Sequence, residues 1–403
     1  MLVLMTALLC LVCMVALGED TVIQAADITA ECRVTTSGGK FKISRMWDRK
    51  YKTTWVSYKE KQPYVAFEAP GGQKIHGVYV CFGDALQPWA LQTEQDGQWV
   101  TVYASDGEYA HEFAAVDGLD NVRIVNQVEK QNVLSLSEMY IFTDGQLPGF
   151  VQRWEPTLQK ADLMVLVAHP DDEILFMGGT IPYYAGELKK DVLVTYMTCG
   201  TTERRSELLD GLWLAGVRHY PVIGPFYDQY SKKLEKGYEI WGKKKVDTYL
   251  VELLRTYRPE VVVTHDVEGE YGHGAHRVCA DALKRCVLAA ADGTQYPEAG
   301  AAWQTKKLYI HLYGENAVEM DWDQPLSAFD GKTGYEVAED MYRCHVSQQD
   351  AGQKNKKTGK FEKFRVEPRD SDYSCYRFGL AFTAVGPDET GNDFLEHVEL
   401  PAE

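Results

Sequence analysis

The sequence predicts two domains of different class, an all-β sandwich followed by an α/β domain built on a parallel sheet. The chain has 403 residues, which is enough for two cores of ordinary size. Between residues 28 and 142, short runs rich in Val, Ile, Tyr, Phe and Trp are separated by Gly and Asp turns. From residue 162 onward, buried apolar runs alternate with helical patterns, which favours an α/β domain.

The first half contains the strand and turn signals of a β-sandwich. Regularly spaced short strands joined by turns favour two packed antiparallel sheets. Turn-forming residues at 143–149 mark the start of a linker, which we place at 143–160. The predicted strands lie at 64–68, 75–80, 98–103 and 121–125, the third of them after an Asp96-Gly97 turn.

The order of these features resembles a discoidin (factor V/VIII C-type), galactose-binding-like module. The matching features are Trp55, Gly77-Val78, the run 96–99 and the closing run 136–142. The resemblance implies a jelly-roll-like sandwich over residues 25–142 that binds carbohydrate, with a structural Ca²⁺ as a further option. Aromatic side chains could stack on a sugar, although large aromatics more often pack in cores. The aromatics in question are Trp47, Trp55, Trp89 and Tyr109.

The second half alternates predicted strands and helices. Such units, joined by right-handed crossovers, predict a Rossmann-like parallel sheet. A Gly-rich nucleotide loop does not follow the first strand, so the sequence does not indicate a dinucleotide cofactor. The predicted elements are a strand at 163–167, a helix at 178–188, a strand at 191–197, a helix at 202–214, a helix at 245–257, a strand at 260–265 and a helix at 277–291.

Two polar clusters each follow a buried strand. The first is Ala168-His169-Pro170-Asp171-Asp172-Glu173, and the second is Gly269-Glu270-Tyr271-Gly272-His273-Gly274-Ala275-His276. Ligands bind beyond the carboxyl ends of the strands in open α/β sheets, so we expect the two clusters to meet. The two histidines of the second cluster are three residues apart at a helix start, which places them on one helix face. An acidic turn with a surface histidine would be the simpler interpretation of the first cluster by itself.

The residue types in these clusters suit metal-assisted hydrolysis. His169, Asp172 and His276 supply two imidazoles and one carboxylate, a common ligand set for catalytic zinc. Bound Zn²⁺ lowers the pKa of its water enough for that water to attack an amide near neutral pH. Asp171 would take the proton from the water, and His273 would stabilise the oxyanion and protonate the departing amine.

Taken together, the two clusters are similar to the motifs of the PIG-L/LmbE family of zinc-dependent N-deacetylases. Members of this family act on N-acetylglucosamine-type sugars and related small amides, and the resemblance implies the same residue roles. It extends over the domain that we place at residues 161–403 and includes segments near 204–217 and 376–394. Arg204 is a candidate for binding a sugar hydroxyl or a negative group, and an ion pair with Glu207 is the alternative.

One position departs from the family pattern. The family usually has Asp or Asn immediately before the last ligand histidine, whereas this chain has Ala275. A residue of this kind orients the neighbouring histidine or stabilises its charged form. We therefore expect its absence to affect the pKa and the orientation of His273 more than metal binding. Asp266 or Glu268 could substitute from the preceding loop.

The net charge and the N-terminal residues limit the partners that the protein can bind and indicate its cellular location. The formal net charge is −17, which excludes a nucleic-acid surface because phosphate binding needs a basic footprint. Residues 1–17 are almost wholly apolar and are followed by a polar turn, as in a secretory signal peptide at residues 1–20. We therefore expect a secreted or cell-surface protein without a stable membrane span after cleavage, with retention of the segment as an anchor as the alternative.

The sequence thus predicts a hydrolase that removes the N-acetyl group from an N-acetylated amino sugar in a glycan or glycoconjugate. One alternative keeps the fold and the metal but makes the protein an amidase on another small amide conjugate. The other alternative is a glycan-binding protein with an inactive hydrolase domain, which only Ala275 favours.

Overall fold

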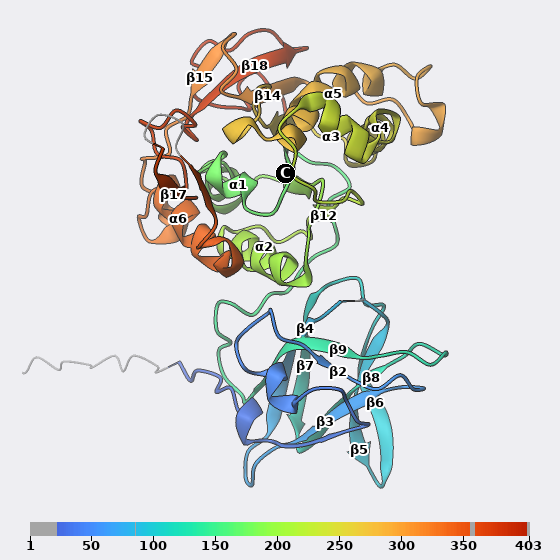
Figure 1. The fold of residues 1–403 in the computed structure, drawn as a ribbon. Helices are drawn as coiled ribbons and strands as arrows, with labels where there is room; N and C mark the ends of the chain where they lie inside the picture. Colours follow the sequence, from blue (N-terminus) through green and yellow to red (C-terminus); the bar gives the residue numbers. More distant parts are fainter. Residues whose placement is uncertain (1–21, 85, 355–358, 401–403) are drawn as a thin grey trace, which may run out of the picture.

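The computed structural model describes residues 22–84, 86–354 and 359–400, and in it an antiparallel β-sandwich is followed by an α/β domain (Figure 1). The predicted fold class is therefore confirmed. The predicted signal peptide lies outside the described residues. Within the described part of the chain, no helix is long and apolar enough to cross a membrane.

The N-terminal domain consists of two antiparallel sheets. A five-stranded sheet has the order β1-β3-β8-β5-β6, and a four-stranded sheet has the order β2-β9-β4-β7. Two short 3-10 helices, η1 (Thr29–Glu31) and η2 (Ile43–Met46), precede the second strand. The strands are β1 (Arg33–Thr36), β2 (Trp55–Val56), β3 (Tyr64–Glu68), β4 (Ile75–Phe82), β5 (Trp89–Gln95), β6 (Gln98–Ser105), β7 (His111–Leu119), β8 (Asn121–Asn126) and β9 (Ser135–Phe142).

The aromatics that could have bound sugar in this domain pack against protein instead. Trp55 and Trp89 are fully buried in the core between the two sheets. Trp47 packs on the same core, and the ring of Tyr109 lies 5.0 Å from that of Tyr220 in the second domain. All four aromatic side chains therefore pack against other parts of the protein, as the alternative interpretation proposed.

The C-terminal domain is built on a seven-stranded sheet of order β12-β11-β10-β13-β14-β18-β15. The first five strands of this order run parallel, whereas β18 and β15 run antiparallel at one edge, so the sheet is mixed rather than wholly parallel. A small hairpin, β16 (Gly352–Lys354) with β17 (Phe361–Lys363), lies outside it. The strands of the sheet are β10 (Leu163–Val167), β11 (Val192–Tyr196), β12 (Val222–Ile223), β13 (Val261–Thr264), β14 (Lys307–His311), β15 (Ala317–Glu319) and β18 (Arg377–Thr383).

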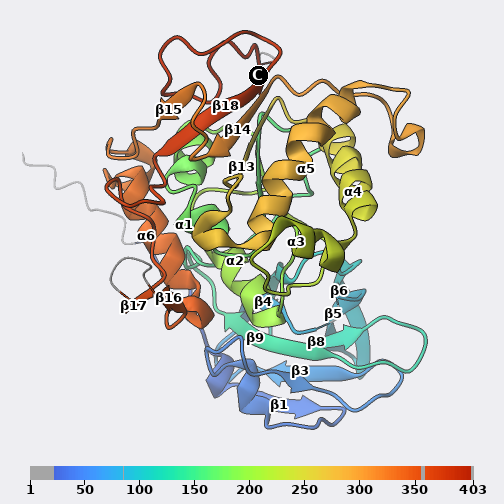
Figure 2. The ribbon, with the colours of Figure 1, turned by 45° about the horizontal axis from the view of Figure 1, so that its top comes forward.

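Helices cover both faces of this sheet (Figure 2). Alternate residues of β10 enter two separate cores, because successive side chains of a strand point to opposite faces. Helices α3, α4 and α5 pack on one core, and α1, α2 and α6 pack on the other. The helices are α1 (Asp172–Leu175), α2 (Thr202–Leu214), α3 (Leu234–Trp241), α4 (Lys243–Tyr257), α5 (Gly274–Ala291) and α6 (Gly334–Cys344).

The segment predicted as a helix at 178–188 does not form one regular α-helix. The chain forms the short α1 at Asp172–Leu175 and then a π-helix, η3, at Pro182–Glu187. Gly178 has a φ of +50° and interrupts the α-helix. A Cβ at Gly178 or Gly179 would collide with the buried side chains of Cys375 or Trp322, so close packing decides the local geometry here.

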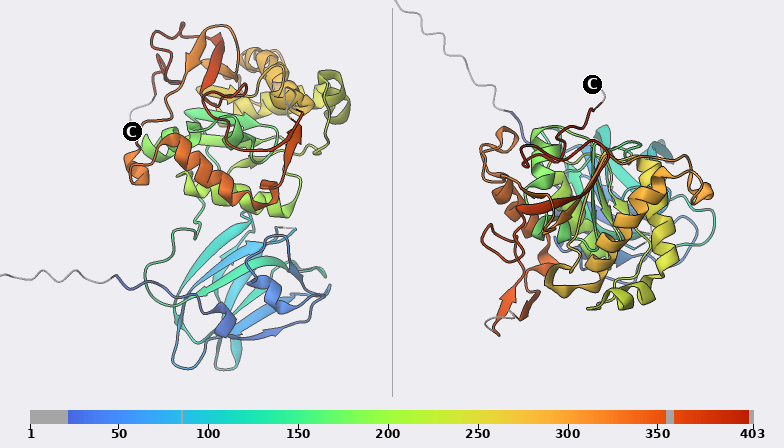
Figure 3. Two further views of the ribbon diagram at one scale, coloured as in Figure 1. Left: turned by 60° about the vertical axis from the view of Figure 1, so that its left-hand side comes forward. Right: turned by 90° about the horizontal axis from the view of Figure 1, so that it is seen from above.

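The two domains contact each other through α2, and Figure 3 shows the α/β domain stacked on one end of the sandwich. Arg205 of α2 donates hydrogen bonds to the backbone carbonyls of Phe82 and Gly83. The hydroxyl of Tyr51 donates to Asp210, one helical turn further along α2, over 3.2 Å. The helix that presents Arg204 is therefore braced by the N-terminal domain.

Candidate metal centre

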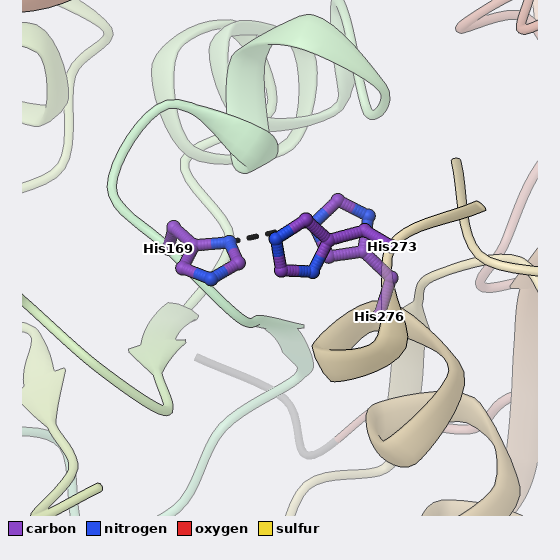
Figure 4. Close-up of side chains that lie close together, drawn as sticks. All are labelled: His169, His273 and His276. Carbon is purple, nitrogen blue, oxygen red and sulfur yellow. Dashed lines mark hydrogen bonds between the residues drawn. The ribbon is translucent and has the colours of Figure 1, made fainter. Parts of the chain in front are cut away.

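The two predicted clusters meet at the carboxyl ends of β10 and β13, which are adjacent in the sheet. The chain passes from β10 to β11 and β12 on one side and then returns to β13 on the other side. This reversal of strand order opens a crevice at which ligands bind in such folds. Figure 4 shows His169, from the loop after β10, facing His273 and His276 at the start of α5.

Three of the predicted ligand atoms converge in this crevice. Oδ2 of Asp172 lies 3.0 Å from Nδ1 of His169 and 3.3 Å from Nε2 of His276, and the two nitrogens are 3.3 Å apart. Ligand atoms about 2.0–2.1 Å from a tetrahedrally coordinated ion lie about 3.3 Å from one another. All three side chains are buried, and the donor set suits a metal ion of the zinc type.

Two neighbouring histidines could form other donor sets. The sets are His169 with His273 and His276, and Asp172 with His265 and His276, each with its atoms within 4.8 Å. However, Nε2 of His265 accepts a hydrogen bond from the backbone N–H of Ala168 over 3.0 Å, so its lone pair is occupied. In the predicted set of His169, Asp172 and His276, the three donor atoms lie within 3.3 Å of one another.

The charge of Asp172 is stabilised by its surroundings. Burial by itself would raise the pKa of this carboxyl, but the imidazoles of His276 and His169 hold the pKa well below its usual range. The backbone N–H of His169 also donates to Oδ2 of Asp172 over 2.8 Å. The carboxylate is therefore ionised and held by its own turn, as metal binding requires.

Glu270, a buried residue of the second cluster, has a role that the sequence did not reveal. Its carboxylate lies 2.8 Å from Nδ1 of His265, 2.9 Å from Nδ1 of His276 and 2.6 Å from Nδ1 of His311. By accepting the Nδ1 hydrogen of the neutral His276 ring, this carboxylate would leave the Nε2 lone pair available to a metal ion. Burial by itself would raise the pKa of Glu270, but His265 and the other imidazoles hold it well below its usual range.

Asp171 lies beside the three converging atoms and is paired with Arg204. Oδ1 of Asp171 is 2.9 Å from Nη2 of Arg204, which also donates to the carbonyl of Pro170. Burial raises the pKa of Asp171 well above its usual range, although Arg204 opposes this shift. The backbone of Asp171 has a φ of +117°, a strained conformation that is common at functional sites.

Arg204 does not pair with Glu207, which was the alternative interpretation of the sequence. The carboxylate of Glu207 instead accepts hydrogen bonds from the backbone N–H and the hydroxyl of Ser347. Nη1 of Arg204 lies 3.4 Å from Oδ2 of Asp228, and Oδ1 of Asp228 lies 3.5 Å from Nε2 of His169. Asp228, in the segment between β12 and α3, is a second residue whose role the sequence did not reveal.

His273 caps the N-terminus of α5. Its Nδ1 accepts a hydrogen bond from the backbone N–H of Ala275 over 3.2 Å, so the single hydrogen of the neutral ring is on Nε2. Burial, together with His276 and His169, lowers the pKa of His273 to about 2. Among the described residues, neither Asp266 nor Glu268 bonds to His273, and Glu268 pairs with Arg277. The backbone N–H of Ala275, rather than either of these carboxylates, therefore contacts the His273 ring.

Residues 164–287 match the family model described as PIG-L, GlcNAc-PI de-N-acetylase. A 1D-myo-inositol 2-acetamido-2-deoxy-alpha-D-glucopyranoside deacetylase 2 of Saccharopolyspora erythraea is 32% identical over 176 residues, or 36% of this chain and 63% of the relative. A deacetylase 1 of the same description from Frankia casuarinae is 29% identical over 195 residues, or 40% of this chain and 63% of the relative. The chain thus spans about 63% of the length of these relatives.

Two solved structures are similar to parts of this chain. A conserved protein of Thermus thermophilus is 21% identical, with 47% of this chain and 80% of that chain covered at a TM-score of 0.35. A chitosan-binding module of a chitosanase/glucanase from Paenibacillus sp. IK-5 is 19% identical, with 29% of this chain and 98% of that chain covered at a TM-score of 0.27.

Proposed function

We propose that the protein is a zinc-dependent N-deacetylase, because residues 164–287 match the PIG-L family model. The substrate is an N-acetylglucosamine-type sugar within a glycan or glycoconjugate. The observation that carries the proposal is the convergence of His169, Asp172 and His276, within 3.3 Å of one another, beside the buried carboxyl of Asp171. A zinc-dependent hydrolase needs such a ligand set next to a base.

His169, Asp172 and His276 would hold the zinc ion. When bound, zinc would polarise the acetamide carbonyl and lower the pKa of the attacking water. Asp171 accepts the proton of this water, because its buried carboxyl directly precedes the ligand Asp172 in the turn after β10. The ion pair with Arg204 keeps Asp171 in position for this transfer.

His273 acts as a hydrogen-bond donor in this mechanism. Its Nδ1 accepts the amide hydrogen of Ala275, so the hydrogen on Nε2 is available to the oxygen that becomes negative as the carbonyl is attacked. The neutral imidazole of His273 is a poor proton donor, so it does not protonate the leaving amine. The proton taken up by Asp171 therefore passes to the amine nitrogen as the C–N bond breaks, and acetate and the free amino sugar leave.

Release of acetate tests the proposal directly. The full-length protein would be loaded with zinc and incubated with N-acetylglucosamine, chitobiose, N-acetylgalactosamine and larger acetylated glycans, with Asp171→Asn as the blank. We expect acetate from at least one amino sugar, and release that is about 10²–10⁴-fold slower from the variant. Absence of acetate from every sugar, in protein that retains zinc, would contradict the proposal and favour an amidase on another amide.

A further inference from the structure

The segment between β12 and α3 is held beside the metal centre at three points. The backbone carbonyl of Ser231 accepts a hydrogen bond from the N–H of Gly274 over 2.7 Å, at the start of α5. The indole of Trp241 donates to the carbonyl of Tyr227 over 2.9 Å. Between these two points, Asp228 contacts His169 and Arg204, as described above. The segment therefore has a defined position relative to the ligand histidines.

This anchored segment exposes two tyrosine rings. Tyr227 is 75% exposed and Tyr230 is 62% exposed, although the residues around them are tied to the protein. The ring of Tyr230 lies 5.0 Å from that of His273, at an interplanar angle of 73°. Within the described part of the chain, no hydrogen bond involves the hydroxyl of either tyrosine. Both rings are thus available to a ligand, and one of them touches the predicted oxyanion-stabilising residue.

We propose that Tyr227 and Tyr230 form a sugar-binding subsite on which the pyranose ring of the substrate stacks. The inference rests on the proposed function and defines its substrate class. The C–H face of a pyranose is apolar and fits against an aromatic ring, while its hydroxyl groups can bond to water or to the phenol groups. Tyrosine provides such contact area at a low cost in conformational entropy.

The position of this subsite determines which compounds would benefit from it. A sugar on Tyr230 would lie next to His273, whose ring is 4.7 Å from that of His169 and 4.6 Å from that of His276, so an N-acetyl substituent on this sugar is close to the metal ligands. A simple acetamide has no ring face and gains nothing from the tyrosines. Asp228 and the overall charge of −17 disfavour anionic ligands at the same place. The subsite therefore selects neutral amino sugars over small linear amides.

Kinetics with two substrates test this subsite. Chitobiose would be compared with N-acetylethanolamine, which has the same acetamide group but no ring. We expect Tyr230→Ala to raise KM for chitobiose about tenfold, the effect of losing one stacked ring, with kcat changed less than about threefold. Tyr230→Phe keeps the ring and should restore KM, and Tyr227→Ala should have a smaller effect of the same kind. The matched control is Tyr58→Ala, which removes an exposed tyrosine of the N-terminal domain.

The outcomes separate this inference from the proposed function. If the wild-type protein releases acetate from chitobiose and Tyr230→Ala has an unchanged KM, the subsite is refuted while the deacetylase stands. If the wild-type protein releases no acetate, the subsite is tested by calorimetric measurement of chitobiose binding to the full-length protein. Binding that is lost in Tyr230→Ala but kept in Tyr230→Phe and Tyr58→Ala supports the subsite. Equal binding by all variants, or none by the wild type, overturns it.

Discussion

The carboxylate of Glu270 lies 2.9 Å from Nδ1 of His276, on the side of the ring opposite to the nitrogen that faces Asp172. The same carboxylate contacts His265 and His311, so one buried acid orients three imidazoles. In metal sites, such an acid fixes the tautomer of the ligand histidine and increases its basicity. Glu270 is thus as much a part of the proposed centre as the ligands themselves.

Replacing Glu270 should weaken zinc binding. In Glu270→Gln, an amide takes the place of the carboxylate, and we expect zinc affinity to fall by about 10–100-fold. Competition with a chromogenic chelator would measure this change. The matched control is Glu268→Gln, two residues away, where the side chain is exposed and pairs with Arg277. An equal affinity in wild type and Glu270→Gln would show that this carboxylate does not tune the site.

Removing a ligand should remove the metal. We expect His276→Ala to lose most of its zinc, because only two of the three converging donors remain. Metal analysis of the purified protein checks this, with His397→Ala as a control at a half-exposed histidine near the C-terminus. Unchanged zinc content in His276→Ala would mean that the ligand assignment is wrong.

Removing the base should separate metal binding from turnover. Asp171→Asn preserves the shape of the side chain but cannot accept a proton, so we expect acetate release to fall by about 10²–10⁴-fold. Zinc content should stay near the wild-type value, because Asp171 is not among the ligands. Comparable rates for this variant and the wild type would exclude Asp171 as the base.

The contact between the domains should depend on pH through Asp210. Burial raises the pKa of Asp210 to about 7, although hydrogen bonds from Tyr51 and Gln152 oppose the shift. The carboxyl is protonated more readily in the folded than in the unfolded protein, so ionisation lowers stability as pH rises from about 4 to about 7.

Replacement of Asp210 by Asn should therefore stabilise the protein at high pH. The amide oxygen of Asp210→Asn can still accept the bonds from Tyr51 and Gln152. We expect a higher Tm than wild type at pH 8 and no difference near pH 4, measured by calorimetric scans at both values. Because 28% of the Asp210 side chain is exposed, solvent screens part of this effect. A Tm difference that does not change with pH would contradict this account.

Local patterns in the sequence were sufficient for the main architecture. Alternating apolar runs and turns predicted the sandwich, and apolar runs such as 163–167 predicted the buried strands of the second domain. The positions of His169, Asp172 and His276 after adjacent strands predicted their convergence, because parallel strands end at the same edge of a sheet. The ligand roles themselves remain predictions.

The sequence alone therefore determined the order of the domains, the strands and the clusters that the strands carry, since these depend on interactions between near neighbours in the chain. Tertiary packing decided the rest, such as the pairing of Arg204 with Asp171 rather than with Glu207. It also decided the contact of Glu270 with His311, 41 residues away, and the exposure of Tyr230 beside His273. These relationships join segments that are distant in sequence, and no local propensity specifies which of them will be brought together in the folded chain.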